Sequence, residues 1–201
     1  MEIEAKFFVP ARQAMRSTIL DHGGRVFSSR YLERNVRLDD EEATLAGRAA
    51  LLRLRQGTRA TLTYKQGTVQ FERREEIEIE VDDFNRSLEL LTSLGFSPVA
   101  IYEKYREVFH LDPVTLMLDE LPFGCFLEIE GPDLAAIQES AAALDLDWEK
   151  RVQRSYLSIF SRLREAMGFE FSEVTFQNFD QMDPVPFQAL RQAVGQDASD
   201  G

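Results

Sequence analysis

Hydrophobic and polar residues alternate one by one along much of this chain, which is the pattern of a β-strand with one apolar and one polar face. In the opening stretch MEIEAKFF, Glu2, Glu4 and Lys6 alternate with apolar residues. The same alternation predicts eight strands, at 2–8, 30–38, 51–56, 60–66, 74–81, 102–111, 114–121 and 125–131. This number of strands fits a closed or nearly closed barrel of modest width.

Segments with helical periodicity lie between and after the strands. They cover 10–21, 82–95, 132–144, 151–168 and 186–193, and several start at proline or aspartate and stop at glycine. The sequence therefore predicts an α+β fold, an eight-stranded antiparallel tunnel or barrel with a charged lumen and helices packed on its outside. We assign residues 1–168 to this tunnel domain and 169–201 to an extension with a short helix and a disordered tail. In the extension, Phe169, Phe171 and Phe176 could plug one mouth of the tunnel, contact a second copy or cover its apolar outside.

The polar faces of these strands carry charges in pairs, two residues apart. The bases are Lys6, Arg53, Arg55, Lys65, Arg74, Lys104 and Arg106, and the acids are Glu2, Glu4, Glu76, Glu78, Asp119, Glu128 and Glu130. For any single strand, the ordinary interpretation is a solvated sheet surface. Exposed faces usually mix Thr, Ser, Gln and Lys, however, so the repetition favours a charged interior. Unpaired charges are too costly for a dry core, and such an interior must hold water, ions or a ligand.

The presence of both basic and acidic side chains on the polar faces indicates which kind of ligand the interior binds. Carboxylates alone would suggest a hard cation such as Mg2+ or Mn2+. Arginine and lysine alone would suggest phosphate, which the planar guanidinium binds well. Both together indicate a metal-bound polyphosphate.

Composition and net charge limit the kinds of molecule that the protein is expected to bind. The chain has 201 residues, with 35 acidic and 23 basic side chains and a net charge of -12, which argues against nucleic acid and anionic membranes as partners. The single cysteine, Cys125, excludes an intramolecular disulfide. Together with the charged N-terminus and the absence of an apolar run of about 20 residues, this predicts a cytoplasmic protein. We expect a small-molecule triphosphate as its partner, while a homodimer stays open.

The motifs resemble, in order, those of the CYTH superfamily, also called triphosphate tunnel metalloenzymes. The opening E-x-E-x-K resembles the family signature, LLRLR its paired-arginine strand, LTYK its lysine strand and EEIEIE its acidic strand. EKYR resembles its K-x-R strand, LDELPFGCFLEIEG its closing hairpin and SYL its Ser-Tyr helix. The resemblance covers about residues 1–165. It implies an eight-stranded antiparallel tunnel, and family members include inorganic, thiamine and RNA triphosphatases and class IV adenylyl cyclases.

The resemblance also implies roles for individual residues. The divalent cation would be held by Glu2, Glu4, Asp119, Glu128 and Glu130. The substrate phosphates would be bound by Lys6, Arg53, Arg55, Lys65, Arg74, Lys104 and Arg106, with Arg154 as a further candidate for a lid contact. Either Glu76 or Glu78 would complete a second metal site or orient water, and spacing does not choose between them. Arg154 could equally be a solvated arginine on a helix face.

The expected reaction is the metal-dependent attack of water on the terminal phosphoryl group, with Lys6, Arg53, Arg55, Lys65, Glu76 and Glu78 as the catalytic set. Neither histidine nor Cys125 is placed to support a covalent intermediate. Leu51 and Leu52 stand where vertebrate thiamine triphosphatases carry a tryptophan, and no feature specifies adenine. These absences favour inorganic tripolyphosphate. The alternatives are a thiamine triphosphatase, an adenylyl cyclase and a non-catalytic sensor of polyphosphate or nucleotide. The many carboxylates argue against the sensor, because they would repel a phosphate ligand unless a metal ion intervenes.

Overall fold

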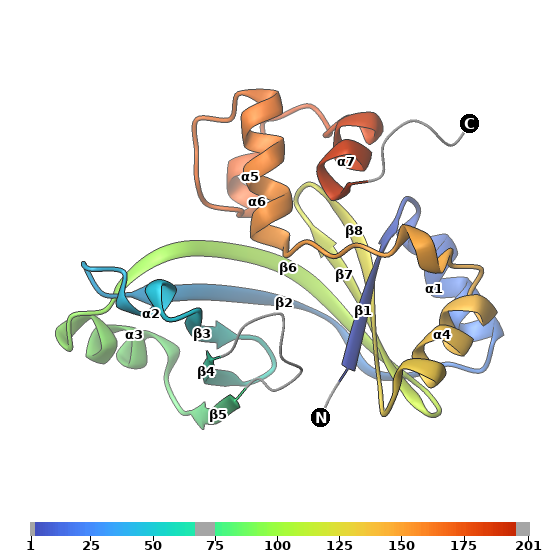
Figure 1. The fold of residues 1–201 in the computed structure, drawn as a ribbon, viewed down its shortest axis with the longest axis horizontal. Helices are drawn as coiled ribbons and strands as arrows, with labels where there is room; N and C mark the ends of the chain where they lie inside the picture. Colours follow the sequence, from blue (N-terminus) through green and yellow to red (C-terminus); the bar gives the residue numbers. More distant parts are fainter. Residues whose placement is uncertain (1–2, 67–74, 196–201) are drawn as a thin grey trace. The chain divides into compact units, whose positions relative to one another are not determined.

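The computed structural model describes residues 3–66 and 75–195 and contains one eight-stranded antiparallel sheet (Figure 1). Its strands are β1 (Ile3–Val9), β2 (Arg25–Asp39), β3 (Ala50–Gln56), β4 (Ala60–Gln66), β5 (Glu75–Val81), β6 (Ser97–Leu111), β7 (Val114–Leu121) and β8 (Gly124–Gly131). Their order in the sheet is β1-β8-β7-β6-β2-β3-β4-β5. Within the described residues, no hydrogen-bonded pairing joins β1 to β5. The predicted α+β fold with eight antiparallel strands is confirmed.

Helices connect and follow the strands. They are α1 (Arg12–Asp21), α2 (Thr44–Gly47), α3 (Phe84–Ser93), α4 (Leu134–Ala143), the 3-10 helix η1 (Trp148–Lys150), α5 (Tyr156–Met167), α6 (Phe176–Phe179) and α7 (Phe187–Val194). Side chains cap several of them, because the first backbone N–H groups of a helix lack partners. Asp83, Asp133 and Ser155 accept such N–H bonds at the starts of α3, α4 and α5. No helix in the described part of the chain is long and apolar enough to cross a membrane.

The chain divides into two compact units, which are described separately. The first unit comprises Met1–Tyr31 and Lys104–Gly201, and the second comprises Leu32–Glu103. The long strands β2 and β6, of 15 residues each, contribute to both units. The proposed domain boundary at residue 168 stays a prediction.

In the first unit, α1 and α4 cover the apolar face of β1, β8, β7 and β6 (Figure 1). Ile19 of α1 and Ile137 of α4 are fully buried in this core, together with Phe109 and Leu127 from the strands. Each such side chain contributes about 1.5–3 kcal/mol through removal of apolar surface from water. The strand alternation that buries this face turns the charged positions of the same strands to the opposite face.

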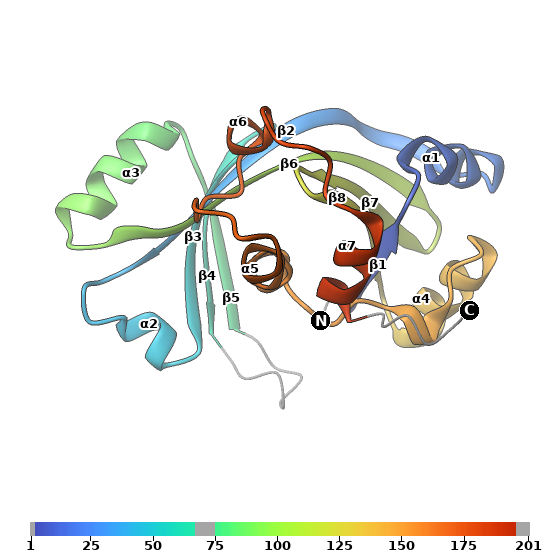
Figure 2. The ribbon, with the colours of Figure 1, turned by 90° about the horizontal axis from the view of Figure 1, so that it is seen from above.

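Helix α5 reaches the charged face of the strands with its first residue. Its Tyr156 contacts charged side chains and Phe126, which lie on the polar face of the strands. Helices α5 and α7 lie side by side in both views (Figures 1 and 2). One buried side chain of α5, Phe160, packs among other aromatic rings. Phe160 lies 5.9–6.4 Å from the rings of Phe123, Phe169, Phe171 and Phe179.

This aromatic cluster gives a location to the phenylalanines of the extension. Phe169 and Phe171 pack against α5, with ring centroids 5.3 Å apart. Phe176 instead lies 4.8 Å from Tyr105 of β6. In this structure they serve to anchor the segment that follows α5.

In the second unit, α3 covers the apolar face of β2 and β3. Phe84 and Leu91 of α3 form a core with Val36 of β2 and Leu54 of β3. The hydrogen-bonded pairing places Val36 opposite Leu54, and therefore Arg37 opposite Arg53 on the other face. The fold thus gathers charged side chains on one face of each unit.

Candidate functional site

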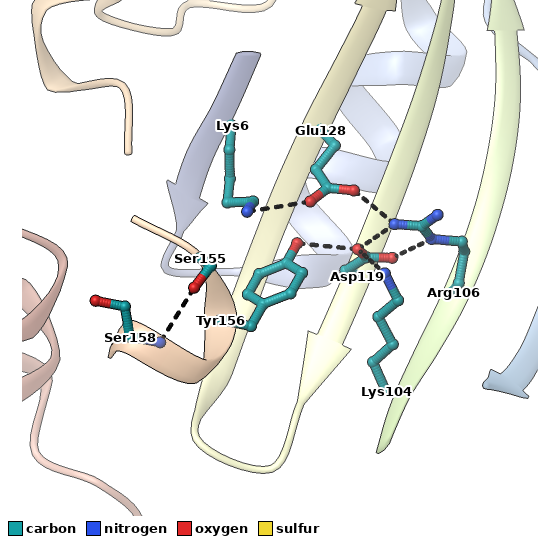
Figure 3. A network of polar contacts seen from close by, with 8 residues as sticks. All are labelled: Lys6, Lys104, Arg106, Asp119, Glu128, Ser155, Tyr156 and Ser158. Atoms are coloured by element: carbon teal, nitrogen blue, oxygen red, sulfur yellow. Dashed lines mark hydrogen bonds and ion pairs between the residues drawn. The ribbon is translucent and has the colours of Figure 1, made fainter. Parts of the chain in front are cut away.

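The first unit contains a buried network of charged side chains on strands β1, β6, β7 and β8 (Figure 3). Arg106 lies at its centre. Its Nε and Nη2 donate to the two carboxylate oxygens of Asp119 at 2.6 Å, and Nη2 also donates to Oε2 of Glu128 at 2.6 Å. Lys6 Nζ lies 3.3 Å from Oε1 of Glu128. The planar guanidinium thus connects both carboxylates, as its fork of donors allows.

Two further groups complete this network, which we call the buried charge network. It consists of Lys6, Lys104, Arg106, Asp119, Glu128 and Tyr156. Lys104 Nζ and the Tyr156 hydroxyl both donate to Oδ2 of Asp119, each at 2.9 Å. The Tyr156 ring also faces the two ammonium groups, at 4.0 Å from Lys6 Nζ and 5.2 Å from Lys104 Nζ. Asp119 is fully buried and is held by four hydrogen bonds.

The local sequence explains why these groups meet. Alternation puts Lys104 and Arg106 on one face of β6, and the pairing sets Arg106 opposite Asp119 of β7. The β1–β8 pairing sets Lys6 opposite Glu128. Tyr156 enters from the first turn of α5, which Ser155 fixes by accepting a hydrogen bond from the Ser158 backbone N–H (Figure 3).

Electrostatics in the network fix the charge states. Burial alone would favour the neutral form of Glu128, but Lys104, Arg106 and Lys6 outweigh it and lower the pKa of this carboxyl well below its usual range. Burial also raises the pKa of Tyr156 well above 10, and the charges of Asp119 and Glu128 add to this effect. Glu128 therefore remains a carboxylate, while Tyr156 remains a hydrogen-bond donor.

The predicted metal ligands fall into two groups. Asp119 and Glu128 are engaged by lysine and arginine in the buried charge network. Glu4 and Glu130 lie directly opposite each other on β1 and β8, on the same face. Two directly opposed carboxylates repel each other, and a bound cation would reduce this repulsion.

Carboxylate oxygens are the ligands that Mg2+ and Mn2+ prefer, so the chemistry of Glu4 and Glu130 fits a divalent cation. Within residues 3–66 and 75–195, no group of three or more His, Cys, Asp or Glu side chains is arranged to hold a metal. The remaining predicted ligand, Glu2, lies outside the described residues.

The second unit carries its own charged face, on β2, β3, β4 and β5. Arg55 Nη2 donates to Glu78 Oε1 at 3.2 Å, and its Nε donates to the hydroxyl of Thr61 at 3.2 Å. Thr63, which is fully buried, donates to the other oxygen of Glu78 at 2.6 Å. Glu78 therefore holds Arg55 in place and is itself oriented by Thr63.

The other predicted residues of this face are paired as well. Lys65 Nζ lies 2.8 Å from Oε2 of Glu76. Arg53 Nη2 lies 4.0 Å from Oε2 of Glu78. Burial opposes the charged form of Arg53, but its contact with Tyr102 and the charges of Glu33 and Glu78 prevail and raise its pKa. Of Glu76 and Glu78, only Glu78 contacts both paired arginines.

Sequence reasoning missed several residues of this face. Glu33, Asn35 and Arg37 of β2 share it, as does Tyr102 of β6 through its contact with Arg53. Asn35 is fully buried and donates to Glu33 at 3.0 Å. Residues 33, 35 and 37 have period-two spacing, but polar residues on both faces of the strand around residue 34 obscured this signal.

Two predicted substrate ligands are not found with the others. Arg74 lies outside the described residues. Arg154 donates to the backbone carbonyl of Val194 at 3.2 Å, at the C-terminal end of α7. Arg154 therefore connects the start of α5 to the end of α7. This contact is neither of the two positions considered for Arg154 from the sequence, a lid contact or a solvated position on a helix face.

With this geometry in place, comparison with known proteins identifies the family. The model of the CYTH domain matches residues 1–163. The chain belongs to the CYTH domain family. The recognition made from its motifs is thereby confirmed, and the divalent-metal dependence of this family applies to it as a class.

Individual CYTH relatives are more distant. A protein of Methanocaldococcus jannaschii named "Putative adenylate cyclase" is 27% identical over 96 residues, which cover 43% of this chain and 55% of that protein. This chain therefore spans about half the length of that curated relative.

Two solved structures extend the comparison. One from Pyrococcus horikoshii is 28% identical, with a TM-score of 0.66, covering 78% of this chain and 97% of that chain. A "putative adenylyl cyclase" from Hippeastrum, described as having a dominant triphosphatase activity, is 20% identical, with a TM-score of 0.61. The match covers 80% of this chain and 95% of the Hippeastrum chain, and its likeness concerns the CYTH fold alone.

Proposed function

We propose that this CYTH protein hydrolyses triphosphates in a divalent-metal-dependent reaction and that its substrate is inorganic tripolyphosphate. The observation that carries the proposal is the buried charge network, in which Lys6, Lys104 and Arg106 converge on Asp119 and Glu128. Burying five charged groups costs more than an apolar core of the same size would. A ligand function accounts for this cost, because lysine and arginine side chains held in position by carboxylates can bind phosphate oxygens with their remaining donors.

In this proposal, the cationic groups of the network bind phosphate oxygens. Asp119 and Tyr156 hold Lys104 and Arg106 in position before substrate arrives, so little reorganisation is needed when charge develops on the leaving oxygen. In the second unit, Arg53, Arg55 and Lys65 bind phosphate oxygens, and Glu76 and Glu78 keep them oriented. Glu78 is also the candidate to accept a proton from the attacking water.

Mg2+ or Mn2+ would be held by Glu4 and Glu130, together with the predicted ligand Glu2. When bound, the cation would neutralise phosphate charge and stabilise the leaving group.

The preference for an inorganic substrate is supported by the position of the tryptophan of this chain. Trp148, the one tryptophan of the chain, lies 6.1 Å from Phe7 and packs against the apolar core. Arg151 covers it at 4.9 Å. It is therefore engaged on the apolar side of the first unit and does not serve as a stacking surface beside the charged residues.

A second candidate is adenylyl cyclase activity, which the name of the Methanocaldococcus jannaschii relative favours. Such an enzyme would convert ATP to cyclic AMP and pyrophosphate. The same phosphate-binding side chains would serve it, so the products distinguish the two activities.

The deciding experiment measures phosphate release from tripolyphosphate, ATP and thiamine triphosphate with Mg2+, with Mn2+ and with EDTA. ATP reactions are also assayed for cyclic AMP and pyrophosphate. Fast, EDTA-sensitive release from tripolyphosphate supports the proposal, and cyclic AMP as the main product replaces it by the cyclase. Lys6→Gln should abolish turnover, whereas Lys150→Gln on η1 removes the same charge elsewhere and should not. Equal loss in both variants would contradict the role of the buried charge network.

A further inference from the structure

Arg37 of β2 lies directly opposite Arg53 of β3 in the sheet pairing. Residues opposed in this way point to the same face, with Cβ atoms about 4.5–5.5 Å apart. Two like charges in these positions repel each other, so the pairing is unfavourable unless an anion or other compensation is present. The neighbouring opposed pair, Asn35 and Arg55, does not share this conflict.

The hydrogen bonds of these arginines are also incomplete. The Nε atoms of both Arg37 and Arg53 are buried and have no hydrogen-bond partner within the described residues. The Oδ1 atom of Asn35, two residues before Arg37, is buried and likewise lacks a partner there. Buried polar atoms normally have partners, so three such atoms on adjacent positions of one face indicate a place where a polar ligand or water binds.

The acids near Arg37 are engaged with other groups. Glu78 contacts Arg53 and Arg55, and among the described residues no salt bridge joins Arg37 to a carboxylate. The nearest acid along the strand is Asp39, whose charge state Arg37 influences. Its oxygens, however, accept the backbone N–H groups of residues 40, 45 and 46 at 2.9–3.0 Å. Arg37 therefore adds a positive charge that forms no salt bridge with a carboxylate in the part of the chain that the structure describes.

We propose that Arg37 is a phosphate-binding residue that acts with Arg53, so that their two guanidinium groups bind the oxygens of one phosphoryl group. An anion between the two groups satisfies both orphaned Nε donors and removes the repulsion of the opposed pair. This inference rests on the proposed function, because it assigns a phosphate to the face that the triphosphate substrate occupies. It adds a third arginine to the pair that the sequence motif identified.

A ligand-binding role and a structural role of Arg37 predict different effects of its replacement on the melting temperature of the ligand-free protein. If Arg37 serves the ligand, Arg37→Gln removes repulsion and an unpaired donor, so the melting temperature without ligand should stay equal or rise. If Arg37 serves the fold, the melting temperature should fall. The control is Arg34→Gln, which removes a charge from the opposite face of β2, where Arg34 lies 6.0 Å from the Phe84 ring.

The experiment measures melting temperature with and without tripolyphosphate, first in EDTA and then with Mg2+, and steady-state kinetics for the preferred substrate. We expect Arg37→Gln to lose most of the stabilisation by tripolyphosphate and to raise KM about tenfold with kcat changed by less than about twofold. Arg37→Lys should be intermediate, because lysine keeps the charge but lacks the planar fork. Arg34→Gln should match the wild type.

Three other outcomes would overturn the inference, and each has a different meaning. A full tripolyphosphate-induced shift and an unchanged KM in Arg37→Gln would show that water, and no phosphate, satisfies these donors. A lower melting temperature without ligand, with the shift retained, would make Arg37 structural. A wild-type protein that neither binds nor turns over any triphosphate would overturn the proposed function first, and this inference with it.

Discussion

Tyr156 at the start of α5 donates a hydrogen bond to Oδ2 of Asp119 on β7, across 37 residues of sequence. Its hydroxyl oxygen thereby joins a helix to the most buried carboxylate of the sheet. The same tyrosine presents its ring to Lys6 and Lys104. The Tyr156 side chain thus connects helix α5 to the buried charge network.

Replacement of Tyr156 by phenylalanine should destabilise the protein by about 1.5–3 kcal/mol, because a buried hydrogen bond to a carboxylate is lost. The lower end is expected, since Arg106 and Lys104 still bind Asp119. For a protein of this size, the melting temperature should fall by about 2–4 °C per kcal/mol. Tyr64→Phe, which removes an exposed hydroxyl bonded to Gln66, is the control. Equal effects of the two substitutions would contradict a specific role for the Tyr156 hydroxyl.

Asp119→Asn should have a larger effect, of about 3–5 kcal/mol, because it removes the central anion from a buried network. Lys104 and Arg106 would still interact with the buried carboxylate of Glu128. Urea unfolding monitored by circular dichroism measures the loss. Asp112→Asn provides the comparison, since Asp112 pairs with Arg25 where both side chains are at least 75% exposed. That pair should contribute less than about 1 kcal/mol, and a larger value would undermine the distinction by burial.

Glu128 should make the protein sensitive to acid. Its folded-state pKa lies below the unfolded value of about 4.3, so the unfolded chain takes up the proton first as pH falls. The stabilisation is therefore complete above that unfolded value and is lost as pH falls through the folded pKa.

Glu128→Gln should be less stable than the wild type at neutral pH but should lose less stability between pH 6 and pH 3. Denaturant unfolding at several pH values tests this. Glu89→Gln on the exposed surface of α3 should follow the wild-type curve. Parallel curves for wild type and Glu128→Gln would contradict the assignment.

The strands could be predicted from sequence because alternation is a local property. Strands β4 and β7 begin and end where the pattern placed them. The first five residues of the 15-residue strands β2 and β6 were missed, since RVFSS and SPVAI do not alternate. The position of α5 also could not be read, because its amphipathic pattern indicates an apolar side but not which rings cover it.

The candidate site, like the strands, could be predicted from the sequence only in part. Side chains from four strands met as the motifs implied, since strand register is fixed by the buried face. The partners within the site were not predictable, however. The assignment of Asp119 and Glu128 as metal ligands stays a prediction, whereas their hydrogen bonds from Arg106 could not be predicted from the sequence. Arg37 was missed because β2 is polar on both faces around residue 34, so alternation did not assign its direction.

Cys125 should react slowly in the folded protein. Burial, reinforced by the charge of Glu120, raises the pKa of its thiol to about 11. At pH 8.5 the thiolate fraction should therefore be on the order of 100-fold smaller than in the unfolded chain. Because this is the single cysteine of the sequence, alkylation by iodoacetamide with and without urea reports on it directly. Equal rates in the two states would show that the thiol is accessible and ionised.

Arg55→Ala should weaken substrate binding far more than it weakens the fold. Arg55 is partly exposed and is oriented by Glu78 and Thr61, an arrangement that leaves its guanidinium available to phosphate oxygens. We expect KM for the preferred triphosphate to rise about tenfold or more, which corresponds to at least about 1.4 kcal/mol of binding free energy. The melting temperature without ligand should change little.

The matched control is Arg59→Ala. Arg59 pairs with Glu80 in the same unit, but both side chains are more than half exposed. Its removal changes the net charge equally and should leave KM unaltered. If the two substitutions raise KM by the same factor, the effect is one of overall charge, and the paired arginines do not contact the substrate. If neither changes KM, the charged face of the second unit has no part in substrate binding.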